Sequence, residues 1–253
     1  MKFETALRWI ISFLLIASLC AFGRDPKADK KDQGKPQSKA VDSGSFGVYV
    51  KGQRVITESF TIAQEDAATS VIKAQLKEAA TSAVVQKSEL HITNAGELVR
   101  YEWSQTSGGS ITVYPNNDFL MEKVTTSASS KAAEQSFLMP STSLILDNNF
   151  FVHREVLLWR YLAADCKTEG SDLKCQQGPV EFGTVVPQDR TSMSVRVQVV
   201  GKEKLNFHGA DRELLRLNLS GESFDWAVWV DDSDQFKLMR VSIPADNTEV
   251  VRD

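Results

Sequence analysis

Hydrophobic and polar residues alternate along much of the chain, and this alternation is its strongest structural signal. In one example, Val195, Val197 and Val199 alternate with Arg196 and Gln198. A period of two sends successive side chains to opposite faces of a strand, so one face is buried and the other largely wet. The pattern therefore predicts antiparallel sheet structure.

Short β-prone runs of this kind are separated by turn residues. The segments 51–53, 94–96 and 107–110 each suit a hairpin, because Gly and Asn adopt positive φ at low cost. The sequence shows neither a strand–helix–strand rhythm nor a repeat of about 20–50 residues. The predicted strands cover residues 46–50, 54–62, 90–92, 97–105, 111–114, 180–186, 192–200, 203–207, 213–219, 224–230, 236–243 and 248–252.

Two segments have apolar residues at helical spacing. Residues 67–86 fit both a helical and a strand period, and we favour strands because the flanking segments are strands. Residues 150–164 form the best helix, with a broad apolar surface and with Asp147 or Asn148 as its cap. The fold class expected is all-β or β-rich α+β. It is a curved antiparallel sheet, a half-barrel or a sandwich, of roughly ten to twelve strands with one main helix.

The N-terminus has the order of a cleaved secretory signal peptide, residues 1–23. A basic start and eleven mostly apolar residues, 9–19, precede the small residues Ala21 and Gly23. The alternatives are an uncleaved anchor and a lipoprotein attached through Cys20. As a helix the apolar run would reach about 17 Å, short of the ~30 Å bilayer core, which favours cleavage. We expect no transmembrane span after signal removal.

The next segment, residues 24–45, is polar. It holds six basic and four acidic residues and almost nothing apolar, so it cannot offset its ordering entropy by burial. We expect a disordered tether here and a single β-rich domain over residues 46–253.

Composition narrows the function classes. Of 253 residues, 42% are hydrophobic and 25% charged, which are globular proportions. The formal net charge of −4 disfavours a nucleic-acid partner held by a basic surface. Three Cys and three His are too few for a multi-zinc or multi-disulfide scaffold.

Cys166 and Cys175 remain after removal of the signal peptide. An even cysteine count in an exported chain predicts a structural disulfide, here across a turn of polar residues and one glycine. Free thiols and a metal site are the alternatives. A redox-active pair would need the Cys-x-x-Cys spacing, which is missing.

The sequence lacks the His-Glu-x-x-His and Gly-x-Ser-x-Gly motifs and a phosphate-binding loop. Weak catalytic candidates are Asp147, Asn149 and His153, because an Asp–His pair at the start of the helix could act as a general base or hold a metal. We favour the interpretation that the acidic and amide residues cap the helix and that His153 is a half-buried structural histidine. We therefore expect no cofactor and lean against an enzyme.

Three carboxylates share one turn, Asp231, Asp232 and Asp234, and are weak metal candidates. The calcium-loop pattern fails, because Phe236 and Ser242 occupy its sixth and twelfth positions. A turn whose Asp side chains bond to their own backbone is favoured.

Six aromatic residues could line an apolar ligand cavity or belong to an ordinary core. They are Tyr101, Trp103, Trp159, Tyr161, Trp226 and Trp229.

The two ends of the predicted domain carry a resemblance. The runs 46–52 (FGVYVKG) and 58–62 (ESFTI) resemble the opening hairpin of uncharacterised exported bacterial domains. The runs 226–232 (WAVWVDD) and 238–241 (LMRV), followed by Pro244, resemble the closing hairpin of those domains and of periplasmic lipoprotein-carrier-like half-barrels. The resemblance implies an exported curved sheet around a helix, able to hold acyl chains, with no catalytic residues to carry over.

Together these features predict a non-catalytic envelope protein, periplasmic or extracellular, of a Gram-negative bacterium. The expected ligand is apolar, a lipid or a lipoprotein acyl chain, held in the curved sheet. The alternatives are a hydrolase or metal enzyme built on Asp147, Asn149 and His153, and a structural module that binds another envelope protein through its sheet edges.

Overall fold

The computed structural model describes residues 38–127, 129–169, 172–176 and 178–253, which belong to one unit of the chain, residues 36–253. The predicted signal peptide and most of the predicted tether lie outside the described residues. In the described part, the first strands are β1 (Lys39–Val50), β2 (Gln53–Gln64), β3 (Thr69–Glu78), β4 (Val84–Thr93), β5 (Leu98–Gln105), β6 (Ser110–Asn116), β7 (Phe119–Thr125), β8 (Ala133–Phe137) and β9 (Leu144–Ile145).

The helix α1 (Val152–Asp165) follows, and the second half returns to strands. These are β10 (Cys166–Glu169), β11 (Asp172–Cys175), β12 (Val180–Val186), β13 (Thr191–Phe207), β14 (Ala210–Ser220), β15 (Asp225–Asp231), β16 (Lys237–Ile243) and β17 (Thr248–Arg252). Two short 3-10 turns, Pro187–Asp189 and Pro244–Asp246, precede β13 and β17.

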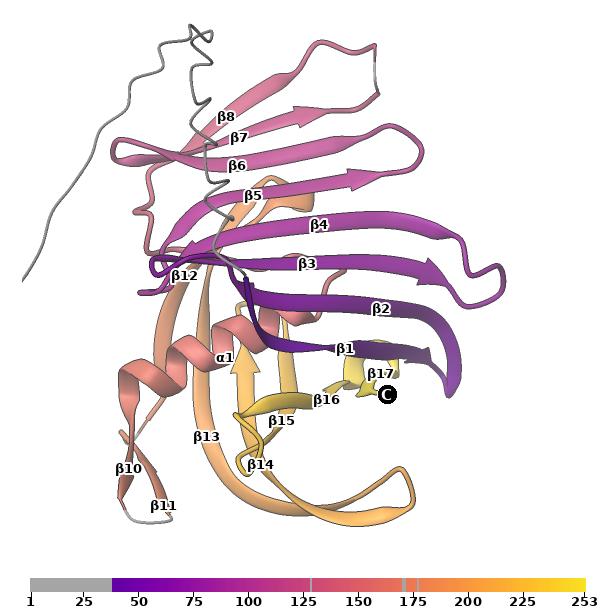
Figure 1. Ribbon diagram of the computed structural model, residues 1–253, viewed down its shortest axis with the longest axis vertical. Coiled ribbons are helices and arrows are strands. Elements are labelled where there is room, and N and C mark those ends of the chain that lie inside the picture. Colours follow the sequence, from indigo (N-terminus) through magenta and orange to yellow (C-terminus); the bar gives the residue numbers. More distant parts are fainter. Residues whose placement is uncertain (1–37, 128, 170–171, 177) are drawn as a thin grey trace, which may run out of the picture. The chain divides into compact units, whose positions relative to one another are not determined.

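Fifteen of these strands form one open sheet in the order β8-β7-β6-β5-β4-β3-β2-β1-β17-β16-β15-β14-β13-β12-β9 (Figure 1). Its pairs are antiparallel except β9 with β12, which is parallel. Two runs of consecutive hairpins meet at the β1–β17 pair, where Phe46 lies opposite Arg252. The strands β10 and β11 form a separate hairpin beyond the end of α1.

The β-rich prediction is confirmed, but the predicted strand count is too low, since the described residues form seventeen strands. Among those missed, β7 buries only two of its seven residues, Leu120 and Glu122, and β8 buries only Phe137. The pairing of β7 with β6, and of β8 with β7, fixes them as strands, which a local pattern cannot reveal. The predicted strands 192–200 and 203–207 are one strand, β13, with a register shift between Val199 and Gly201.

The ambiguous segment 67–86 forms strands, as favoured. It supplies β3 and the start of β4, joined by a turn. The strand β1 begins earlier than predicted, at Lys39, so its first residues belong to the segment expected to be a tether. Pairing with β2 orders them, and Asp42 is buried there against Arg252.

The helix is confirmed within two residues of its predicted ends, but its predicted cap is wrong. The N-cap residue is Phe151, which has no side-chain cap of its own. Asp147 instead accepts the amides of Asn149 and Phe150, at 2.7 and 3.1 Å, just before the helix.

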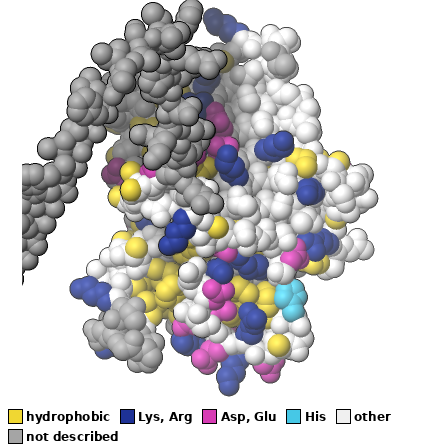
Figure 2. Space-filling model, viewed as in Figure 1, with side chains coloured by type: hydrophobic (Ala, Val, Ile, Leu, Met, Phe, Trp, Pro, Cys, Tyr) yellow, Lys and Arg dark blue, Asp and Glu magenta, His cyan; other side chains and the backbone are white. Residues whose placement is uncertain are grey.

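One face of the sheet packs against α1, and we call it the inner face. The core between them is apolar, and Phe150, Leu157 and Leu158 of the helix segment are at most 1% exposed. A second, smaller apolar cluster of Phe207, Leu214, Trp229 and Met239 forms separately in the C-terminal half. In the described part visible in Figure 2, basic and acidic side chains are interspersed around the apolar areas.

Candidate functional site

The strands β2 to β6 divide their side chains between two faces. One cross-strand row, Phe60, Ala74, Ser88, Trp103 and Ile111, is set by the register of the four pairs. Most of this row is buried toward α1, and Ser88 lies 3.5 Å from the His153 ring of the helix. Because side chains alternate, the neighbouring rows point to the opposite face, which we call the outer face.

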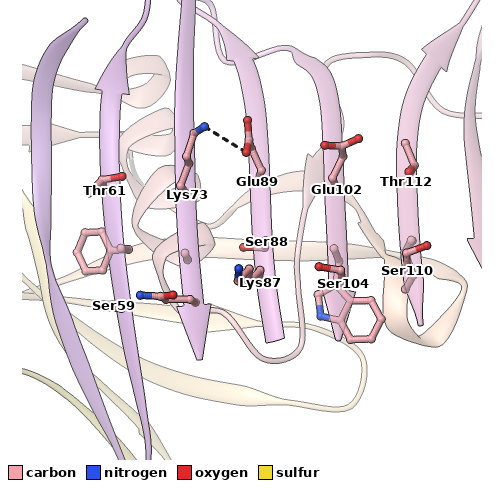
Figure 3. Close-up of a pocket in the computed structure, with 15 residues that line it drawn as sticks. Ser59, Thr61, Lys73, Lys87, Ser88, Glu89, Glu102, Ser104, Ser110 and Thr112 are labelled. Carbon is pink, nitrogen blue, oxygen red and sulfur yellow. Dashed lines mark ion pairs between the residues drawn. The ribbon is translucent and has the colours of Figure 1, made fainter. Parts of the chain in front are cut away.

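A groove of about 740 Å³ lies on this outer face (Figure 3). Residues of that cross-strand row, including the partly buried Trp103, also line it. We define the outer groove by its ten polar side chains: Ser59, Thr61, Lys73, Gln75, Lys87, Glu89, Glu102, Ser104, Ser110 and Thr112.

These side chains form two parallel rows across five strands. The first row, in strand order, is Ser59, Gln75, Lys87, Ser104 and Ser110; the second is Thr61, Lys73, Glu89, Glu102 and Thr112. Neighbouring positions are one strand spacing apart, about 4.8 Å. The groove thus presents hydroxyl, amide and charged groups at regular intervals across the strands.

Both carboxylates of the groove have cationic or imidazole partners. Glu89 lies 3.2 Å from the Lys73 ammonium and 2.7 Å from His91. Glu102 accepts a 2.8 Å hydrogen bond from Arg100 on the same strand. Among the described residues, no carboxylate pairs with Lys87, so the first row carries one uncompensated ammonium.

On the inner face, the ionisable residues hold the helix. Glu58 of β2 is fully buried and accepts the amides of Phe151 and Val152, at 2.6 and 3.0 Å. Burial raises the pKa of Glu58 to about 8, and the two amides and Arg154 limit the rise. This carboxylate satisfies amides at the helix N-terminus that would otherwise lack partners.

The predicted catalytic candidates lie beside this contact. Asp147 is buried, and besides the two amides it accepts hydrogen bonds from the Tyr101 hydroxyl and from Gln188, the latter at 2.8 Å. Asn149 donates to Gln86 of β4 at 3.0 Å. Both side chains therefore join the loop before α1 to the sheet.

His153 contacts Ser88 through Nε2, but its Nδ1 has no hydrogen-bond partner in the described part of the chain. Burial lowers the pKa of His153 to about 4, so the ring is neutral at pH 7. A Ser–His–Asp relay requires a carboxylate bonded to the second ring nitrogen. Here Asp147 bonds elsewhere, and His153 is only 1% exposed.

A second buried network was not predicted. Arg252 of β17 bonds to Asp42 of β1 at 2.7 Å and to Glu155 of α1 at 3.3 Å. Burial raises the pKa of Glu155 to about 9, and Asp42 adds to the rise. This network ties the helix to the seam between β1 and β17.

The three carboxylates of the acidic turn, residues 231–234, bond to the protein's own amide and ammonium groups. Asp231 accepts the Ser233 amide at 3.0 Å, and Asp234 pairs with Lys237 at 3.0 Å. Asp232 pairs with Lys202 at 2.7 Å. The described residues contain no cluster of three His, Cys, Asp or Glu side chains suited to a metal.

The six aromatic candidates do not gather around one cavity. Tyr101 and Tyr161 are buried core residues, and Trp226 and Trp229 belong to different apolar clusters. Trp159 borders a shallow pocket of about 240 Å³ with Lys39 and Gln235. Beside α1, the cavity next to His153 holds about 10 Å³, too little for an acyl chain.

The predicted disulfide is present. Cys166 and Cys175 lie opposite each other in the β10–β11 hairpin and are bonded, with Cα atoms 3.9 Å apart.

Sequence reasoning missed the outer groove, because it depends on the register of five strands. The available signal was the polar half of each alternating run. Comparison of the chain with family models, curated proteins and solved structures finds no match. Within the described residues, no helix has the length and apolar character needed to cross a membrane.

Proposed function

We propose that this protein is a non-catalytic, exported binding protein of a bacterial envelope and that the outer groove is its ligand site. The observation that carries the proposal is the pair of polar rows across β2–β6, which border about 740 Å³. The buried Asp147, Asn149 and His153 are committed to joining α1 to the sheet, which argues against a catalytic role. The disulfide favours an oxidising compartment, periplasmic or extracellular.

In this proposal the sheet is a half-barrel whose concave side α1 fills. The backbone groups of β2–β6 already bond to neighbouring strands, so a ligand cannot add as a further strand there. It must be recognised by side chains, and those of the groove are hydrogen-bonding groups. A polar ligand fits this site better than the apolar one expected from the sequence.

The test is a titration of the ¹⁵N-labelled protein with soluble fragments of purified envelope polymers, followed by NMR. A ligand of the groove should shift amide signals of β2–β6 and leave those of α1 and β12–β16 unchanged. Thr112→Trp, which fills one end of the groove, should abolish the shifts. Ser136→Trp, on the outer face of β8 beyond the groove, is the control. Shifts confined to other elements, or unaffected by Thr112→Trp, would contradict the proposal.

An apolar ligand is the second candidate, favoured by the way α1 is held. Polar and ionisable contacts anchor the helix to the sheet through Glu58 and Glu155. Displacement of α1 would expose a large apolar concave face. Native mass spectrometry of the purified protein tests this second candidate, which requires a co-purified lipid. Removal of that lipid should also change the environment of Trp159.

A further inference from the structure

Resting on the proposed function, we infer that the ligand of the outer groove is an acidic oligosaccharide whose carboxylate or phosphate group binds Lys87. The direction of the groove, the chemistry of its rows and one uncompensated charge support this ligand.

The groove runs across the strands. Each strand contributes one side chain to each row, so hydrogen-bonding groups repeat at about 4.8 Å. An extended peptide advances only about 3.4 Å per residue and would fall out of step with the rows. A pyranose ring spans about one strand spacing, so successive sugars of an extended chain can face successive strands.

The first row suits a polyhydroxylated ligand. The side chains of Gln75, Ser104 and Ser110 both donate and accept hydrogen bonds, as sugar hydroxyls do. Most apolar side chains of these strands are buried on the inner face, so the two regular rows of the groove consist of polar side chains.

The charge of the ligand follows from Lys87. Glu89 is compensated by Lys73 (Figure 3) and Glu102 by Arg100, whereas Lys87 pairs with no carboxylate of the described residues. It stands in the middle of the first row, between Gln75 and Ser104. An anionic group at this point would gain a charge-assisted hydrogen bond from the ammonium.

The net charge of −4 does not oppose this placement. At physiological ionic strength the screening length is about 8 Å, so the local ammonium outweighs distant carboxylates.

The probes are tetragalacturonic acid and its methyl ester, which have the same backbone but differ in charge. Calorimetric titration of the full chain should show binding of the acid that weakens as salt is added, and weaker binding of the ester. Lys87→Met should reduce affinity for the acid about tenfold or more, the usual loss for one hydrogen bond to a charged group. Lys87→Arg should restore much of it. Lys123→Met, which removes a lysine of the outer face beyond the groove, should have little effect.

Three outcomes would overturn the inference. The acid and its ester could bind equally, the Lys87→Met variant could bind the acid as well as the wild type, or neither probe could bind. Equal binding of acid and ester, or unchanged binding by Lys87→Met, would still be compatible with the proposed function if Thr112→Trp blocks binding. If neither probe binds, the envelope-fragment titration decides the proposed function separately. If pentaglutamate binds as tightly as the acid, and Lys87→Met weakens that binding, the groove is a site for acidic peptides instead.

Discussion

The carboxylate of Glu58 accepts the amide of Phe151 at 2.6 Å, although the two residues are 93 positions apart. A strand residue thus does the work that a Ser, Thr, Asp or Asn usually does at a helix start. The contact determines where α1 begins and against which strand it lies.

Glu58→Gln should therefore destabilise the protein. A glutamine can accept only one of the two amides and turns its NH₂ toward the other, so a loss of about 1–3 kcal/mol in the free energy of unfolding is expected. Urea denaturation followed by tryptophan fluorescence measures it. The exposed Glu65→Gln is the control, and equal stabilities of the two variants would refute the capping role.

Arg252→Met should cost more, about 3–5 kcal/mol, because it removes the buried cation that bonds to both Asp42 and Glu155 and leaves Asp42 only the more distant Lys237, 3.7 Å away. The double variant Asp42→Asn with Arg252→Met should recover part of the loss. The matched control is Arg54→Met, which breaks the half-exposed pair with Asp253, worth about 0–1 kcal/mol. Similar losses in the two arginine variants would argue against a buried network.

Stability should fall as the pH rises from about 6.5 to 9. The pKa values of Glu58 and Glu155 are about 8 and 9 in the folded protein, against about 4.3 when unfolded. The folded state therefore binds more protons in this range, and its advantage is lost as each carboxyl ionises. His153, with its pKa lowered to about 4, acts in the opposite direction only below about pH 6.5.

Denaturation at several pH values tests this slope. Glu155→Gln, which stays neutral, should make the dependence shallower between about pH 7 and 9, while Glu65→Gln should leave it unchanged. A stability that rises with pH over this range would contradict the assignment of these carboxyls.

His153 should remain neutral from about pH 8 down to 5.5, because it is buried and its pKa is about 4. In an NMR titration the ring proton signals of His153, assigned through His153→Gln, should not move over this range. A midpoint above about pH 6 would show that the ring is accessible and would revive the catalytic hypothesis.

The disulfide should contribute about 2–3 kcal/mol by the loop-entropy relation, a shift of about 5–10 °C in melting temperature. The variant with Ser at both Cys166 and Cys175 tests this. Because the full chain also holds Cys20, thiol titration of the unfolded, unreduced chain should find one reactive thiol, and three after reduction. Three before reduction would rule out the bond.

Features that depend on neighbouring residues could be predicted from the sequence. The alternation in β13, the apolar surface of α1 and the disulfide hairpin are each set within a few turns of chain. The contacts that position the helix could not be predicted, because Glu58 and Arg252 meet α1 across roughly a hundred residues. The outer groove was hidden for the same reason, since a shift of one residue between strands would send its side chains to the inner face.

The pairing of β1 with β17 also constrains how the chain folds. The strands β1–β8 can pair in sequence as they emerge, but the seam cannot close until Thr248–Arg252 are available. Closing a loop of this length is entropically costly and slow compared with forming hairpins. The two hairpin arrays would therefore exist briefly as separate pieces, and the final residues of the chain join them.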